Sequence, residues 1–140
     1  MKIGLDSTVF KNRKFIEWLI FNKNVFKPHI SEIVYIETLL WYKRLGIGKD
    51  GFDSDLNELN ARINFMDVDL ADLITENAVK FGKQFPFKYH ARDYVIGSSA
   101  ESAGSYLITD NIRHFRWLSG KVPVMTPEEF VNLCMKKKYI

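Results

Sequence analysis

The chain has 140 residues, of which 46% are hydrophobic and 14% aromatic, and its formal net charge is +3. A chain of this length can bury one compact core, and its aromatic content excludes a disordered segment. Eight glycines and four prolines are too few for a collagen-like or low-complexity protein. The mildly basic charge permits a polyanionic partner without demanding one. We therefore expect a single folded domain over residues 1–140.

Strands and helices are predicted from short apolar runs and from apolar residues at helical spacing. In chain order, they are a strand over 2–5, a helix over 12–21, an extended segment over 27–30, a helix over 32–45, a loop over 46–55, a helix over 56–62, a strand over 63–68, a helix over 71–81, a connector over 85–90, a helix over 91–103, a strand over 106–109, a turn and short helix over 111–118, a strand over 122–125 and a helix that begins after residue 126. This alternation predicts an α/β fold with a mostly parallel sheet of four to five strands. The ligand site of such a sheet lies beyond the carboxyl ends of its strands.

The single cysteine, Cys134, excludes an intramolecular disulfide framework and a cysteine-rich zinc site. This cysteine usage is typical of a reducing compartment, so we expect a cytoplasmic protein. The sequence contains no run of about 18 apolar residues, which is the length needed to span a membrane. Asp6 interrupts the N-terminus before an apolar stretch could serve as a signal sequence.

Two carboxylates directly follow predicted strands. Asp6 follows the strand over 2–5, and Asp110 follows the strand over 106–109. These positions match the place where a parallel sheet holds its ligand. Either aspartate could instead only cap the helix that comes next, because aspartate is common at helix N-termini.

Glu37 lies on an apolar face of the helix over 32–45. Its neighbours one turn away are Ile33, Val34, Leu40 and Trp41. An unpaired buried carboxylate costs several kcal/mol unless it is neutralised or binds a cation. A cation site and a salt bridge to a core-lining Arg or Lys both satisfy this requirement.

Asp93 is predicted in the first turn of the helix over 91–103. Ile96, Gly97 and Ala100 follow it at helical spacing, so its face is apolar and small. Small residues allow close packing, which would bring Asp93 near the strand ends. The helix dipole, which favours a carboxylate in the first turn, is the alternative explanation. Carboxylates from separate segments at one sheet edge indicate a site for a hard cation such as Mg²⁺ or Mn²⁺.

Four segments carry a resemblance to a known family, namely residues 3–10, 31–39, 92–100 and 106–115. With these segments in this order, the chain resembles the PIN-domain nucleases, in particular the small VapC-type ribonuclease toxins, over essentially its whole length. The resemblance implies a three-layer sandwich and Mg²⁺- or Mn²⁺-dependent endoribonuclease cleavage of single-stranded or loop RNA. It also implies a homodimer and a small antitoxin partner.

The resemblance implies that Asp6, Glu37 and Asp93 are acidic residues of the metal site. Many family members have a fourth acidic residue two positions after the strand-ending threonine, where this chain has Asn111. Asp110, one position earlier, is a ligand, an outer-sphere partner or only a cap. A second departure is a threonine at position 8, where the family usually has Asn or Ser, although Ser7 keeps the hydroxyl after the first aspartate.

Our mechanistic hypothesis is that Asp6, Glu37 and Asp93 hold one or two divalent ions, which activate a water to attack the phosphate. Asp110 or Asn111 would position that water or the second ion.

Four further residues are candidates for RNA contact, namely Ser7, Lys11, Lys14 and Arg113. The lysines lie in a basic region around the first helix, which could equally be a solvated face. His114 is interpreted as a surface residue.

Two other classes of function compete with a nuclease, namely another α/β protein with an aspartate at a strand end and a PIN-like module that is not an enzyme. In the first class, a phosphatase of the haloacid dehalogenase type needs a second aspartate two residues after the first, where this chain has Thr8. A response-regulator receiver needs an acidic pair and a late lysine in a pattern that this sequence lacks. A catalytically weakened PIN-like module for RNA binding or scaffolding stays open because of Asn111. Such a module should not need Mg²⁺ or Mn²⁺ to bind RNA.

Overall fold

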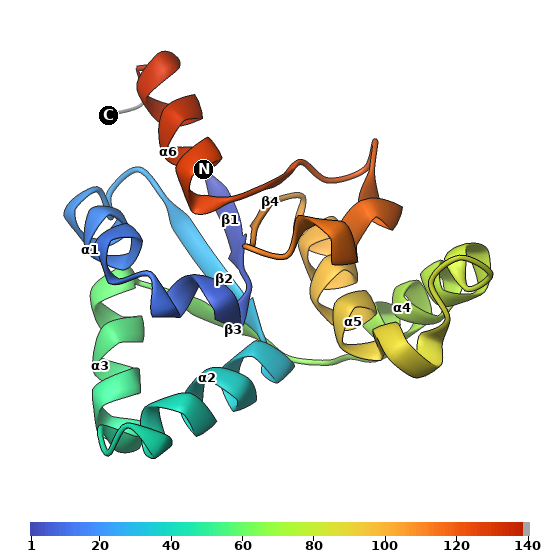
Figure 1. Ribbon diagram of the computed structural model, residues 1–140, viewed down its shortest axis with the longest axis horizontal. Helices are drawn as coiled ribbons and strands as arrows, with labels where there is room; N and C mark the ends of the chain where they lie inside the picture. The colour runs from blue at the N-terminus through green and yellow to red at the C-terminus, as the bar shows by residue number, and fades with distance from the viewer. Residues whose placement is uncertain (139–140) are drawn as a thin grey trace.

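The computed structural model describes residues 1–138, so residues 139–140 of the expected domain lie outside the described residues. Its centre is a five-stranded sheet in the order β3-β2-β1-β4-β5, and every neighbouring pair of strands is parallel (Figure 1). The strands are β1 (Lys2–Leu5), β2 (Lys27–Ser31), β3 (Arg62–Asn64), β4 (Tyr106–Ile108) and β5 (Val124–Met125). The predicted α/β class with a parallel sheet is confirmed.

The strand order creates a switch point beside β1. The chain builds the sheet outwards from β1 to β2 and β3, and then returns to the other side of β1 as β4 and β5. Parallel sheets leave a crevice at the carboxyl ends of the strands where the order reverses. Asp6 directly follows β1 and Thr109 directly follows β4, so both residues lie at this crevice.

Helices cover both faces of the sheet and make the three layers of a PIN-like sandwich. Figure 1 shows α1, α2 and α3 on one side of the sheet, and α4 and α5 on the other. In chain order, the helices are the 3₁₀ helix η1 (Ser7–Lys11), α1 (Arg13–Phe21), α2 (Glu32–Arg44), α3 (Gly48–Leu59), α4 (Val68–Phe81), α5 (Phe87–Ala103), the 3₁₀ helix η2 (Ile112–Leu118) and α6 (Pro127–Lys136). No helix within residues 1–138 has the length and apolar character needed to cross a membrane.

Helix α5 positions part of the candidate site because it packs directly on β1, β2 and β4. Gly97 permits a close approach to η2, since a Cβ atom at this position would lie 2.6 Å from the Trp117 ring. Ser98, Ser99 and Ala100 are also buried in this helix. The prediction that small residues allow close packing here is confirmed.

The predicted loop over residues 46–55 is wrong, because most of it belongs to α3. Phe52, Leu56 and Leu59 are buried at helical spacing, and their burial outweighs the low helix propensity of glycine. Gly46 has a φ angle of +78° and lies in the turn before the helix, and Gly48, with a φ angle of +76°, is its first residue.

The predicted connector over residues 85–90 is also partly wrong. Helix α5 begins at Phe87, directly after Pro86. Proline is tolerated at a helix start because it lacks only its backbone N–H, and the N–H groups there have no partner within the helix. The predicted strand over 63–68 shortens to β3 because α4 begins at Val68, where the side chain of Asp67 accepts a hydrogen bond from the Leu70 N–H. The predicted strand over 122–125 shortens to the two residues of β5.

Candidate active site

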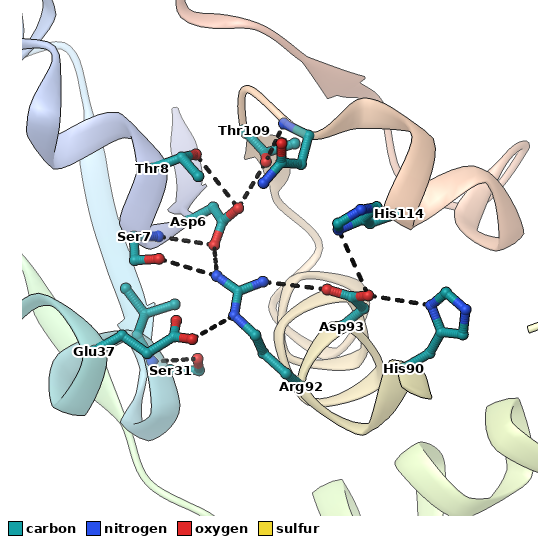
Figure 2. Close-up of polar contacts among 12 residues, drawn as sticks. Asp6, Ser7, Thr8, Ser31, Glu37, His90, Arg92, Asp93, Thr109 and His114 are labelled. Carbon is teal, nitrogen blue, oxygen red and sulfur yellow. Dashed lines mark hydrogen bonds and ion pairs between the residues drawn. The ribbon is translucent and has the colours of Figure 1, made fainter. Parts of the chain in front are cut away.

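Three carboxylates from distant parts of the chain meet around one guanidinium (Figure 2). Arg92 donates through Nη2 to Asp6 Oδ1 at 2.5 Å, through Nε to Glu37 Oε2 at 2.5 Å and through Nη1 to Asp93 Oδ1 at 3.1 Å. Asp6 follows β1, Glu37 lies on α2, and Arg92 and Asp93 lie on α5. The structure therefore brings Asp6, Glu37 and Asp93 together, with Arg92 between them.

Asp6 is fully buried and held by four donors. Its Oδ1 accepts the Ser7 N–H at 2.8 Å in addition to Arg92, and its Oδ2 accepts the hydroxyls of Thr109 at 2.7 Å and Thr8 at 3.4 Å. Thr109 is fully buried as well. A buried carboxylate in such a set of donors keeps one orientation.

Glu37 lies at the rim of the site rather than inside an apolar face. Its side chain is 32% exposed, and of its predicted apolar neighbours Val34 is buried but Leu40 is 47% exposed. The fully apolar environment expected for Glu37 is therefore wrong, and the alternative of a salt bridge to an arginine is present. Glu37 Oε1 is buried and has no hydrogen-bond partner among residues 1–138.

Asp93 is 5% exposed and lies in the second turn of α5, because the helix begins at Phe87. The helix-dipole explanation required the first turn, and it is therefore wrong. The second carboxylate oxygen, Oδ2, faces His90 Nδ1 at 3.3 Å and His114 Nδ1 at 3.8 Å. His114 thus belongs to the site, although its side chain is 51% exposed.

The cluster has an excess of negative charge. Three carboxylates surround one guanidinium, which leaves two formal negative charges without a cation among these four residues. Burial by itself would lower the pKa of Arg92, but the carboxylates of Glu37 and Asp6 outweigh burial and raise that pKa above its ordinary value. Arg92 therefore stays charged at every pH at which the protein is folded.

The side chains of Asp110 and Asn111 make no hydrogen bond or ion pair with this cluster in the described part of the chain. Both residues are exposed. Their backbones do reach it: the Asp110 N–H donates to Thr8 Oγ1 at 3.2 Å, and the Asn111 N–H donates to Thr109 Oγ1 at 3.0 Å.

The predicted RNA contacts lie at the surface around the cluster, with one exception. Ser7 is inside it, since its Oγ accepts from Arg92 Nη2 at 2.9 Å. Lys11, Lys14 and Arg113 are exposed. The ammonium of Lys11 lies 5.7 Å from the centre of the Trp41 ring.

Sequence reasoning did not identify Arg92, Thr109 or His90 as members of the site. Arg92 directly precedes Asp93 and Thr109 directly precedes Asp110, so adjacency to a candidate acid was the available signal. Nothing in a single sequence shows that one arginine spans three segments, because this requires the packing of α5 against α2 and the sheet.

The donor set fits a hard divalent cation. Carboxylate oxygens are the ligands that Mg²⁺ and Mn²⁺ prefer, and Glu37 Oε1 is a buried oxygen that lacks a partner among the described residues. Within residues 1–138, no group of three or more Asp, Glu, His or Cys side chains is close enough to hold a metal ion as the side chains stand. The Arg92 guanidinium lies between the carboxylates, so they must move closer together before they can share an ion.

Comparison with known proteins gives matches only among solved structures. No family model and no curated protein matches the sequence. A chain in a toxin–antitoxin complex from Klebsiella pneumoniae matches with a TM-score of 0.59 and 18% identity, over 89% of this chain and 97% of the other.

Two further structures give the same result. A chain of VapBC-1 from nontypeable Haemophilus influenzae matches with a TM-score of 0.59 and 18% identity, over 91% of this chain and 99% of the other. A chain of VapBC2 from Rickettsia felis, bound to a DNA fragment from its promoter, matches with a TM-score of 0.58 and 16% identity, over 89% of this chain and 97% of the other. At this identity the likeness establishes the fold, and the chain has the PIN-like fold found in VapBC toxin–antitoxin complexes.

Proposed function

We propose that this protein is a divalent-metal-dependent endoribonuclease and the toxin of a toxin–antitoxin pair. The observation that carries the proposal is the meeting of Asp6, Glu37 and Asp93 at the switch point of a parallel sheet. The fold shared with chains of VapBC complexes supports it independently.

Each of the three acids has a role that follows from its surroundings. Asp6 is the fixed ligand, because Thr109 and the Ser7 N–H hold its two oxygens. Glu37 is the adjustable ligand, because it lies at the rim and one of its oxygens has no hydrogen-bond partner in the part of the chain that the structure describes. Asp93 completes the set from α5. An ion held by these carboxylates supplies activation of water and stabilisation of charge on the phosphate.

Exposed cations support a polyanionic substrate. Lys11, Lys14 and Arg113 are solvent-facing, and the first two lie on the segment that begins directly after Asp6. Phosphate contacts of this kind give affinity that falls steeply with salt. We therefore expect RNA to bind across η1 and the start of α1, with weaker binding as salt rises.

An antitoxin partner is part of the proposal. The matched chains come from toxin–antitoxin complexes. On α2, Ile36 is 59% exposed and Leu40 is 47% exposed, one turn apart and beside Glu37. Exposed apolar pairs of this kind are typical of protein interfaces. A short reading frame beside this gene would be the first partner to co-express, and sedimentation of the isolated chain would test the expected homodimer.

One observation favours a second candidate function. The ion pairs of Arg92 partly neutralise the acidic cluster without any metal, as they would in a PIN-like module that binds RNA and does not cleave it. The two functions differ in their need for a divalent ion, since RNA association by a binding module would be the same with and without chelator.

The test is cleavage of a mixed pool of single-stranded RNA by the wild-type chain and by Asp6→Asn, each with Mn²⁺ and with EDTA. We expect cleavage only by the wild-type chain with Mn²⁺. Circular dichroism of both proteins controls for folding. RNA binding without any cleavage by metal-loaded wild-type protein would favour the binding module, and cleavage that persists in EDTA would contradict the metal-dependent mechanism.

A further inference from the structure

Arg92 uses nearly all of its hydrogen-bonding capacity inside the acidic cluster. A guanidinium has five N–H groups. Four of them point at Asp6 Oδ1, Glu37 Oε2, Asp93 Oδ1 and Ser7 Oγ, at distances from 2.5 to 3.1 Å (Figure 2). One side chain thus links the segment after β1, helix α2 and helix α5.

These contacts occupy the atoms that a divalent ion would need. Mg²⁺ binds its oxygen ligands at about 2.0–2.1 Å, so it cannot share an oxygen lone pair with a donating N–H. The second oxygen of Asp6 already accepts from Thr109, and the second oxygen of Asp93 faces two histidines. Glu37 Oε1 alone has no partner in the described part of the chain. Arg92 lies between the three acids, so an ion that occupies the space they share must displace its guanidinium.

The displacement is physically accessible. The Arg92 side chain is 28% exposed, so solvent lies next to the guanidinium and can receive it. A divalent ion compensates two carboxylates where the guanidinium compensates one, which favours the ion electrostatically once it is available. Without an ion, loss of the guanidinium would leave the buried carboxylates of Asp6 and Asp93 without the arginine charge that faces both of them.

We propose that Arg92 is a positioning residue that competes with the divalent ion for the same carboxylate oxygens. It holds the three acids in place in the metal-free protein and moves outwards when the ion binds. The inference rests on the proposed metal site and adds to it a resident competitor within the chain. It predicts opposite effects of losing Arg92: a less stable metal-free protein and tighter metal binding.

The experiment is a titration of each protein with Mn²⁺, followed by the electron paramagnetic resonance signal of the free ion. We expect Arg92→Gln to lower the Kd for Mn²⁺ by about tenfold or more, and Arg92→Lys to fall between this variant and wild type. The melting temperature in EDTA should fall for Arg92→Gln, and its rise on addition of Mn²⁺ should exceed that of wild type.

A matched control is Arg116→Gln. Arg116 is exposed on η2 and makes no ion pair within residues 1–138, so its loss removes the same charge without touching the carboxylates. Screening by solvent should keep its Kd within about twofold of wild type. A purely structural role for Arg92 would weaken Mn²⁺ binding in the variant, so the direction of the change separates the two roles.

The outcomes are distinct. Suppose that wild type binds Mn²⁺ and Asp6→Asn does not. Mn²⁺ binding by folded Arg92→Gln that is equal to or weaker than that of wild type then overturns the competition but leaves the metal site standing. Absence of Mn²⁺ binding by wild type and all variants overturns the metal site and the inference together. If Arg92→Gln does not fold, Arg92→Lys carries the same test, and unchanged or weaker binding by that variant overturns the inference.

Discussion

The buried histidine of β2 makes the stability of this protein depend on pH. His29 is 6% exposed and lies between Ser105 Oγ, 2.8 Å from Nε2, and Asn64 Nδ2, 2.6 Å from Nδ1. Burial, helped by the nearby charge of Lys2, lowers the pKa of His29 to about 4 from 6.5. The folded protein therefore holds His29 neutral through the mildly acidic range.

The sign and size of the effect follow from proton linkage. Between about pH 6.5 and pH 4 the unfolded chain binds a proton at His29 that the folded chain does not, so the free energy of unfolding falls as the pH falls. Each pKa unit corresponds to about 1.4 kcal/mol, so the depressed pKa predicts a total loss of about 3 kcal/mol. Below pH 4 the folded state is protonated too, and the loss stops growing.

Urea unfolding of wild type and His29→Gln at pH 7, 6, 5 and 4 measures this effect. The carboxylates titrate in both proteins, so the difference between their free energies of unfolding isolates His29. We expect this difference to shift against wild type by about 3 kcal/mol from pH 7 to pH 4. A difference that stays constant within about 0.5 kcal/mol, a typical size for a surface effect, would show that His29 does not cause the pH dependence.

Substitutions at three positions test the packing and hydrogen bonds around the site by urea unfolding. Thr109→Val removes the hydroxyl that donates to buried Asp6 and should lower the free energy of unfolding by about 1.5–3 kcal/mol. Thr109→Ser keeps the hydroxyl and should retain most of the wild-type stability. Equal losses in the two variants would contradict the role of the hydroxyl. Gly97→Ala places a Cβ atom 2.6 Å from the Trp117 ring and should cost about 1–3 kcal/mol, and a neutral result would mean that this contact yields easily. Asp110→Asn changes an exposed side chain and should stay within about 0.5 kcal/mol of wild type; a larger loss would show a contact that the structure lacks.

The sheet and most helices were predictable because their patterns are local. The apolar runs of β1 and β4, the N-cap Ser31 of α2 and the Thr126–Pro127 start of α6 each carry their signal within a few residues. The first half of α3 and the start of α5 were missed because glycine and proline are read as breakers, although Gly48 and Gly51 lie within α3 and Pro86 directly precedes α5. Tertiary burial of Phe52 and Leu56 decided the first case, and burial of this kind is not a local property.

The candidate site divides in the same way. Asp6 and Asp93 could be proposed from a strand end and a helix face, whereas Glu37 was proposed from the resemblance and from an apolar face that the structure does not show. Arg92 could not be proposed, because its role depends on three segments that meet only in the folded chain. The role of Asp110 could not be decided from the sequence, because a strand end fixes the position of the backbone and not the direction of the side chain. Its N–H reaches the site, while its carboxylate is exposed.

The proposed function requires that Asp6, Glu37 and Asp93 hold a divalent ion during RNA cleavage. The most direct measurement is the Mn²⁺ concentration dependence of the cleavage rate for wild type and Asp93→Asn on the same RNA. Loss of one carboxylate ligand should raise the Mn²⁺ concentration needed for half-maximal rate by about tenfold or more, or abolish cleavage, with the fold intact. Full cleavage by Asp93→Asn at the wild-type Mn²⁺ concentration would show that Asp93 does not hold the ion and would contradict the proposed metal site.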